Sequence, residues 1–185
     1  MTVINAASKL LAVLLAVLLL YVYPAAETAE RQDDIARMTA AQNVTRLVDA
    51  VRTKGYISPR MLMEFEEQLA RTGNNYDLSM EHLHKKYVPQ YTDPMNQTSF
   101  TGTYEVVHDG YYLSQIRDRL FPPSGTLSIE DPERRYMLNV GDYFTVSLKS
   151  TNRTPAMLLR EWLLGTAQAS AVFATHGGMV LNEDY

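Results

Sequence analysis

The chain has no cysteine at all, and its first 26 residues contain almost no charge. Without cysteine there is no disulfide, no thiolate nucleophile and no cysteine-bound zinc, although this absence is compatible with any cell compartment. The HExxH zinc motif, the GxSxG nucleophile motif and the GxxxxGK[ST] phosphate loop are also missing. We therefore predict a protein that is not an enzyme and that needs no cofactor.

Positive charge is scarce where a nucleic-acid surface would need it. Up to Ala26 the chain has one basic residue, Lys9, and no acidic residue, so the remainder carries 16 basic against 21 acidic side chains. A nucleic-acid partner is not favoured, because phosphate backbones are bound by basic surfaces. The length of 185 residues leaves room for one ordinary domain beside an N-terminal segment. We expect an anchor at residues 1–26 and one domain at residues 27–185.

An uninterrupted apolar run occupies Leu10–Ala26. With the residues that precede it, the run approaches the ~20 residues that a membrane-spanning helix needs. A buried core helix or a cleaved signal peptide would look similar, but Lys9 is the only basic residue before the run and no small-x-small cleavage site follows it. We favour an uncleaved transmembrane anchor. Its marker residues are Leu10, Leu14, Leu18, Tyr21, Tyr23 and Pro24.

The two ends of the apolar run differ in a way that predicts its orientation. Tyr21 and Tyr23 suit the aromatic belt at one membrane interface, whereas Lys9 and the free amine lie at the other end. Acidic residues follow the run from Glu27 onward. We expect a single-pass protein of the cell membrane, in contact with the lipid bilayer, with its C-terminal domain extracytoplasmic.

Helical spacing continues beyond the apolar run until Lys54-Gly55 supplies a stop. Residues 27–55 are predicted to be an amphipathic continuation of the same helix, and Pro24 is expected to kink it near the bilayer surface. The apolar stripe of this second half is expected to pack on the domain core. The predicted packing face consists of Ile35, Met38, Val44, Leu47, Val48 and Val51.

Capping signals, alternation and turn residues divide the rest into short elements. Three further helices are predicted, from Ser58-Pro59 to Thr72-Gly73, over Leu113–Leu120, and from Thr154-Pro155 to Gly165. The predicted strands are 76–82, which ends before Pro89, then 104–107, 143–149, and 170–180, which is broken at Gly177-Gly178. Pro89–Gly102 is predicted to be a loop, and residues 122–125 are predicted to be a break between elements. The fold class is α+β, a long transmembrane-plus-amphipathic helix packed on a small antiparallel sheet with short helices.

Several short motifs accompany this layout: Gly55-Tyr56-Ile57-Ser58, Leu69-Ala70-Arg71-Thr72-Gly73, Glu81-His82, Tyr87-Val88-Pro89 and Asp142-Tyr143-Phe144-Thr145-Val146. Together with the long N-terminal helix they make the chain resemble bacterial type IV pilin-like and pseudopilin subunits, and more narrowly the TadE-type minor pilins of tight-adherence systems. The resemblance implies a membrane-anchored structural subunit of a pilus or secretion assembly. Other pilin-like subunits or assembly-platform proteins would be its partners.

Two departures from the pilin pattern refine this expectation. The chain shows no short basic leader that ends in glycine, and position 5 is Asn5 where pilins carry a glutamate near the start of the mature helix. We therefore expect an accessory, membrane-resident subunit and not a polymerising major pilin. The alternative is a single-pass anchored extracytoplasmic ligand-binding or sensory module, and an envelope hydrolase is the least favoured class.

His82 and His84 are the one pair of side chains with metal-binding spacing. Alternate residues of a strand share a face, so these two imidazoles could bind zinc, with His108 or His176 as a third ligand. No carboxylate cluster stands near them in the sequence. We therefore expect solvated or hydrogen-bonded histidines and predict no metal site.

Overall fold

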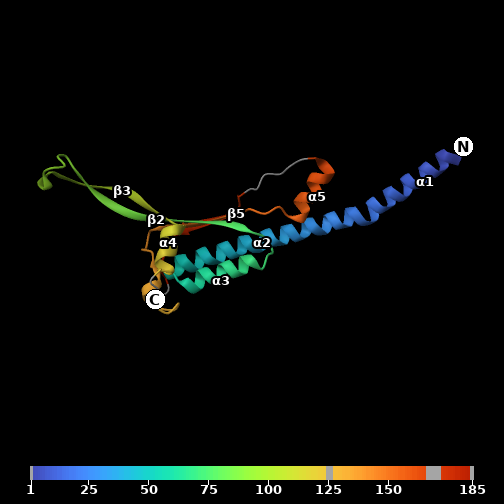
Figure 1. Cartoon of the computed structure of the whole chain (residues 1–185). Coiled ribbons are helices and arrows are strands. Elements are labelled where there is room, and N and C mark those ends of the chain that lie inside the picture. The colour runs from blue at the N-terminus through green and yellow to red at the C-terminus, as the bar shows by residue number, and fades with distance from the viewer. Residues whose placement is uncertain (1, 124–126, 166–171, 184–185) are drawn as a thin grey trace.

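A continuous helical rod and a four-stranded sheet make up the computed structural model, which describes residues 2–123, 127–165 and 172–183 (Figure 1). The rod consists of α1 (Thr2–Val17), a π-helical turn (Leu18–Val22) and α2 (Tyr23–Lys54). It ends at Gly55, whose left-handed backbone and N–H bond to the Val51 carbonyl form the expected stop. The predicted helix through residue 54 is confirmed.

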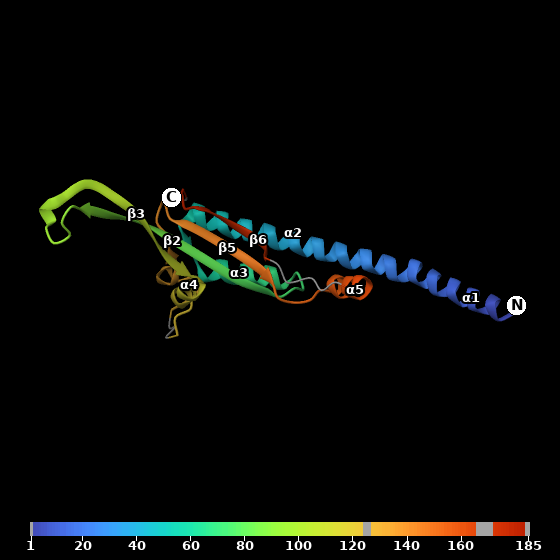
Figure 2. The same ribbon diagram turned by 90° about the horizontal axis from the view of Figure 1, so that it is seen from above.

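Pro24 is accommodated by the π-helical turn in front of it. A proline inside a helix lacks an N–H, and its ring presses against the carbonyl four residues earlier, here that of Leu20. The wider turn pairs the Tyr23 N–H with the carbonyl of Leu18, five residues back. Where the sequence predicts a kink, the structure thus has a π-helical turn, and the rod continues as α1 on one side of it and as α2 on the other (Figure 2).

The N-terminal part of the rod packs on nothing in the described chain. Leu10, Leu14 and Tyr21 are 68%, 66% and 72% exposed, and Leu18, Tyr23 and Pro24 are exposed as well. Within the described residues, one helix is long and apolar enough to cross a membrane, and its most apolar stretch is wholly unburied. Lipid or other helices would have to cover such a surface.

The sheet is antiparallel throughout, with the strand order β3-β2-β5-β6. Its strands are β2 (Tyr76–Tyr91), β3 (Phe100–Tyr112), β5 (Tyr143–Ser150) and β6 (Val172–Met179), and a separate short pair joins β1 (Tyr56–Ile57) to β4 (Tyr136–Met137). The short helices are α3 (Pro59–Ala70), α4 (Leu113–Leu120) and α5 (Pro155–Leu164). The predicted α+β class and all three short helices are confirmed.

The core lies between this sheet and the C-terminal half of α2, with α3 beside it (Figure 1). Its largest fully buried side chains are Phe144, Ile57, Leu62, Met80, Ile116, Leu120, Leu148, Val44, Val48, Val51, Val146 and Val180. The C-terminal segment closes the end of α2, because the N–H groups of Leu181 and Asn182 bond to the Arg52 carbonyl at 2.9 and 3.0 Å. These bonds satisfy a carbonyl that the end of a helix leaves free.

The packing face of α2 differs from the predicted one at its start. Val44, Leu47, Val48 and Val51 are buried as expected, but Ile35 and Met38 are 64% and 59% exposed. At 3.6 residues per turn the buried line continues backward through Ala40 and Ala36, which places Ile35 and Met38 on the opposite side of the helix. Small residues, not large ones, thus mark the start of the packed face.

Two strand predictions are wrong in extent. The strand predicted to stop before Pro89 continues to Tyr91, and the partner strand begins at Phe100, so the loop spans only residues 92–99. Pro89 is tolerated because β5 pairs with β2 only as far as Leu83, which leaves β2 beyond that point with one neighbour and a free edge. Residues 84–91 and 100–109 therefore form a two-stranded ribbon that projects away from the body (Figure 1).

The predicted break at Gly177-Gly178 does not occur, and β6 runs through both glycines. A Cβ on Gly177 would lie 2.5 Å from the Thr145 hydroxyl oxygen and 3.1 Å from the Phe144 carbonyl oxygen. The glycines thus permit close packing and do not interrupt the strand. The first residues of the predicted strand, Ser170 and Ala171, and residues 124 and 125 of the predicted break lie outside the described residues.

Candidate functional site

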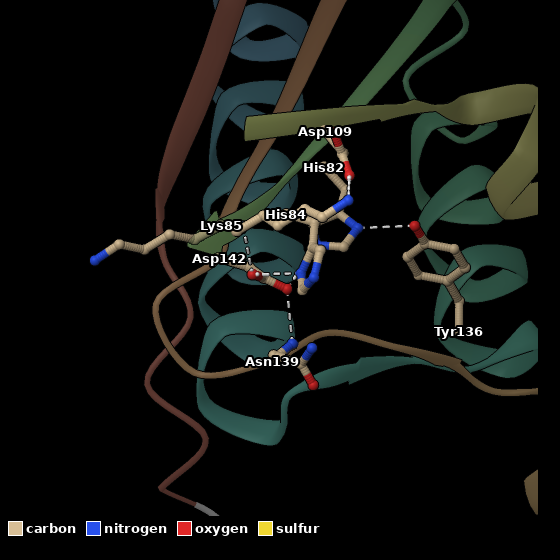
Figure 3. A network of polar contacts seen from close by, with 8 residues as sticks. His82, His84, Lys85, Asp109, Tyr136, Asn139 and Asp142 are labelled. Atoms are coloured by element: carbon tan, nitrogen blue, oxygen red, sulfur yellow. Dashed lines mark hydrogen bonds and ion pairs between the residues drawn. The ribbon is translucent and has the colours of Figure 1, made fainter. Parts of the chain in front are cut away.

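The pairing of β2 with β5 brings His82, His84 and Asp142 together. His82 stands opposite Phe144 and Leu83 opposite Tyr143, so the same register places His84 opposite Asp142, just before β5 begins. Strand alternation puts both imidazoles on one face of β2. Tyr136 reaches the same place from β4 (Figure 3).

Asp142 is the centre of this cluster and accepts four hydrogen bonds. One carboxylate oxygen, Oδ1, accepts from His84 Nδ1 at 2.9 Å and from the Lys85 N–H at 3.0 Å. The other, Oδ2, accepts from His82 Nε2 at 2.8 Å and from the Asn139 N–H at 2.8 Å. The carboxylate is thus fully satisfied although it is 1% exposed.

The hydrogen bonds determine which atoms carry the protons. Burial acts to raise the pKa of Asp142, but the N–H groups of Asn139 and Lys85 and the two imidazoles outweigh it and lower the pKa below its usual value. Since an ionised carboxylate only accepts, His82 Nε2 and His84 Nδ1 both donate to it. Burial, with the nearby charges of Tyr111 and Asp142, raises the pKa of Tyr136 to about 12. Tyr136 is therefore protonated, and it donates to His82 Nδ1 at 2.7 Å when that imidazole is neutral with its proton on Nε2.

The cluster forms the floor of an open pocket of about 530 Å³. His82 is buried and stacks on Tyr111, with ring centroids 5.5 Å apart, while His84 keeps 31% of its side chain exposed. Two cations, Arg119 and Arg135, also line the pocket. A buried anion, two imidazoles and an accessible opening thus occur in one place.

The predicted histidine pair therefore exists, but its third partner is different from the expected ones. His108 is exposed on β3 opposite Lys85, and His176 lies with Nε2 3.5 Å from Asp49 Oδ1, so neither joins the cluster. The sequence shows no carboxylate cluster near His82 and His84, but the fold brings one carboxylate, that of Asp142, to both histidines. In sequence, Asp142 is 60 residues from His82 and looks like an ordinary turn residue, so only the strand register could have revealed it.

A second exposed feature is the aromatic face of the β2–β3 ribbon. Tyr91, Phe100 and Tyr104 contact one another in series, with centroid separations of 5.8 and 5.3 Å. Tyr87 and Tyr104 are 58% and 60% exposed. Since directly opposite residues of an antiparallel pair share a face, Tyr87 with Val106 and Pro89 with Tyr104 extend the same surface.

Comparison of the chain with protein-family models, with curated proteins and with solved structures finds no match. The function is therefore inferred from three features of the molecule itself. These are the helical rod, the sheet domain and the cluster around Asp142.

Proposed function

We propose that the protein is a membrane-anchored, non-catalytic structural subunit of a bacterial pilus or secretion assembly, comparable to a minor pilin or pseudopilin. Its rod crosses the cell membrane once and its sheet domain lies on the extracytoplasmic side. Its partners are the lipid bilayer and other pilin-like subunits or platform proteins.

The observation that carries this proposal is the continuity of the rod. One helix joins an exposed apolar half to a half that is packed under an antiparallel sheet, without a flexible linker between them. A linker would suffice if the helix only tethered the domain. A rigid connection instead transmits the position of the domain to the membrane segment, which a subunit of an ordered assembly requires.

The surface of α1 also supports contacts between helices. Ala12 and Ala16 are four residues apart and lie on one side of the helix, where small side chains allow a second backbone to approach closely. Leu14 lies on the opposite side, because two residues turn the helix by about 200°. A partner helix is therefore expected on the alanine side and lipid on the leucine side.

The pocket above the Asp142 cluster favours one alternative, an anchored extracytoplasmic ligand-binding or sensory module. A pocket of about 530 Å³ with two arginines at its wall could admit a small anionic ligand. The two functions differ in what α1 contacts. A tether needs only lipid around its helix, whereas a structural subunit needs neighbouring helices.

Cysteine cross-linking in the native membrane distinguishes these functions, because the chain has no cysteine of its own. We expect Ala12→Cys and Ala16→Cys to form cross-linked species that contain other pilin-like chains or further copies. The matched control Leu14→Cys, on the other side of the same helix, should form far fewer. Recovery of the monomer alone from all three variants would contradict the proposed function.

A further inference from the structure

We propose that His82, His84 and Asp142 form a binding site for a divalent transition-metal ion of the zinc class. The proposal concerns the sheet domain alone and does not depend on the proposed structural role of the protein. It also goes beyond the expectation from the sequence, which offered a histidine pair without a carboxylate.

The donor atoms are already at nearly the right separations. One ligand atom from each of the three residues lies within 4.8 Å of the others. In a tetrahedral zinc site with bonds of about 2.0–2.1 Å, ligand atoms are about 3.3 Å apart. His82 Nε2 and His84 Nδ1 stand 2.8 and 2.9 Å from the carboxylate oxygens. Small side-chain rotations would open enough space for the ion.

The ion would take the place of two N–H hydrogens. His82 Nε2–H and His84 Nδ1–H now point at the same carboxylate. When each neutral ring carries its proton on the other nitrogen instead, His82 Nε2 and His84 Nδ1 change from donors into two ligands directed at a common point. The carboxylate contributes the negative charge that partly balances the ion. Nitrogen from imidazole and oxygen from carboxylate are a usual combination for zinc.

Groups behind the ligands already hold them in position. Tyr136 bonds to the far nitrogen of His82 at 2.7 Å, and the N–H groups of Lys85 and Asn139 orient the Asp142 carboxylate. Such second contacts are typical of metal sites, where they orient the ligand rings. Tyr136 would then accept the bond from His82 Nδ1–H, which a hydroxyl can do without moving.

Three protein ligands leave a fourth position, and it would lie on the pocket side. His84 is the partly exposed member of the cluster, so the ion would be reached from solvent past this residue. Arg119 and Arg135 line the same opening. Water or a small anion would therefore complete the coordination.

The competing explanation is a purely structural hydrogen-bond network, in which the two ring protons are permanent. The two explanations differ in a simple measurement. A metal site binds the ion with defined stoichiometry and loses it when a ligand is removed, whereas a closed network of satisfied groups binds none.

The test uses the full-length chain in detergent micelles, without a polyhistidine tag and after treatment with a chelator. Isothermal titration with Zn²⁺ should show about one equivalent bound. Co²⁺ should give the visible absorption of a four-coordinate site, and Zn²⁺ should raise the thermal unfolding midpoint until EDTA reverses the rise.

His84→Ala is the informative variant, because this partly exposed residue can be replaced without opening the core, whereas His82 and Asp142 are buried. Its affinity for Zn²⁺ should fall at least about tenfold. His108→Ala and His176→Ala are matched controls that remove a histidine outside the cluster, and both should bind like the unmodified chain. Absence of Zn²⁺ binding by the unmodified chain would overturn the proposal. So would binding that survives His84→Ala but is lost in a control variant.

Discussion

At the scale of single residues, the cluster around Asp142 depends on partners that are far apart in the chain. His82 is held from both sides, by Asp142 through Nε2 and by Tyr136 through Nδ1. Each of these bonds is made by a buried or half-buried group, so removal of one partner leaves a polar atom with neither a protein partner nor full access to water. A polar atom left in this way lowers the free energy of unfolding by more than an exposed hydrogen bond contributes to it.

Tyr136→Phe tests this dependence. The variant retains the ring but removes the hydroxyl, which leaves His82 Nδ1 unpaired. We expect the free energy of unfolding to fall by about 1–2 kcal/mol, measured by thermal unfolding of the chain in detergent with EDTA present. Tyr87→Phe is the control, because Tyr87 is 58% exposed and should tolerate the change. Equal stability of the two variants would show that the Tyr136 bond contributes nothing.

Gly177 is a second residue whose role can be measured. An alanine there would place its Cβ 3.1 Å from the Phe144 carbonyl oxygen, a backbone atom that cannot move without disturbing β5. We expect Gly177→Ala to lower the free energy of unfolding by about 1–3 kcal/mol, as overpacking does. At Gly110, in β3, the nearest atom is the Tyr112 hydroxyl at 3.3 Å, the end of a flexible side chain. Gly110→Ala should therefore have little effect, and a similar loss in both variants would argue against the close-packing explanation.

At the scale of elements, α5 is held beside α2 close to the point where the rod leaves its apolar segment. Arg160 pairs with Glu30 at 2.8 Å, and the Thr154 hydroxyl donates to Asp33 at 2.5 Å. Glu30 is six residues beyond Pro24, about 9 Å along the helix axis. Trp162 and Leu158 of α5 remain 71% and 49% exposed. Tryptophan favours the membrane interface, so in the proposed membrane-anchored arrangement we expect α5 to contact the lipid headgroups.

The fluorescence of Trp162 can test this contact, because it is the only tryptophan in the chain. In lipid nanodiscs we expect a blue-shifted emission that brominated lipids quench. Arg160→Glu should weaken both effects, because it replaces the attraction to Glu30 by repulsion and releases α5. An emission that is insensitive to brominated lipid in the unmodified chain would show that α5 does not touch the membrane.

At the scale of the whole molecule, the rod and the ribbon project from opposite ends of the sheet domain (Figures 1 and 2). The apolar part of the rod contributes nothing to the core, since the first buried residue of α2 is Ala36. Membrane insertion and folding of the domain should therefore be separable. The border between them lies in α2, between the apolar segment and the contacts of Glu30 and Asp33.

Removal of residues 1–26 should consequently leave a soluble, folded domain. We expect its near-ultraviolet circular dichroism to match that of the full-length chain in detergent, and gel filtration to show a compact species. Removal of residues 1–42 should destabilise the domain, because it deletes Ala36 and Ala40 and the acidic partners of α5. Aggregation of the shorter truncation would mean that the N-terminal segment is part of the folding unit.

The sequence alone was sufficient for structure that depends on neighbours along the chain. Ser58 and Thr154 cap their helices as predicted: their hydroxyl oxygens accept hydrogen bonds from the N–H groups of Met61 and Met157. Such caps can be predicted because the two partners are only three positions apart in the sequence. The long rod, its stop at Gly55 and the short helix at residues 113–120 follow from the same local rules. The length and composition of the apolar, uncharged run were likewise enough to predict that one helix could cross a membrane.

Only the tertiary structure decided which distant residues meet. The extension of β2 past Pro89 depends on β3 as a partner, and the exposure of Ile35 and Met38 depends on where the sheet covers α2. Asp142 joins His82 and His84 because antiparallel strands pair in a register that no local pattern specifies. Tyr136 comes from a strand 54 residues away from His82. Contacts of this kind arise when the chain packs, so the histidine pair could be read from the sequence but its carboxylate could not.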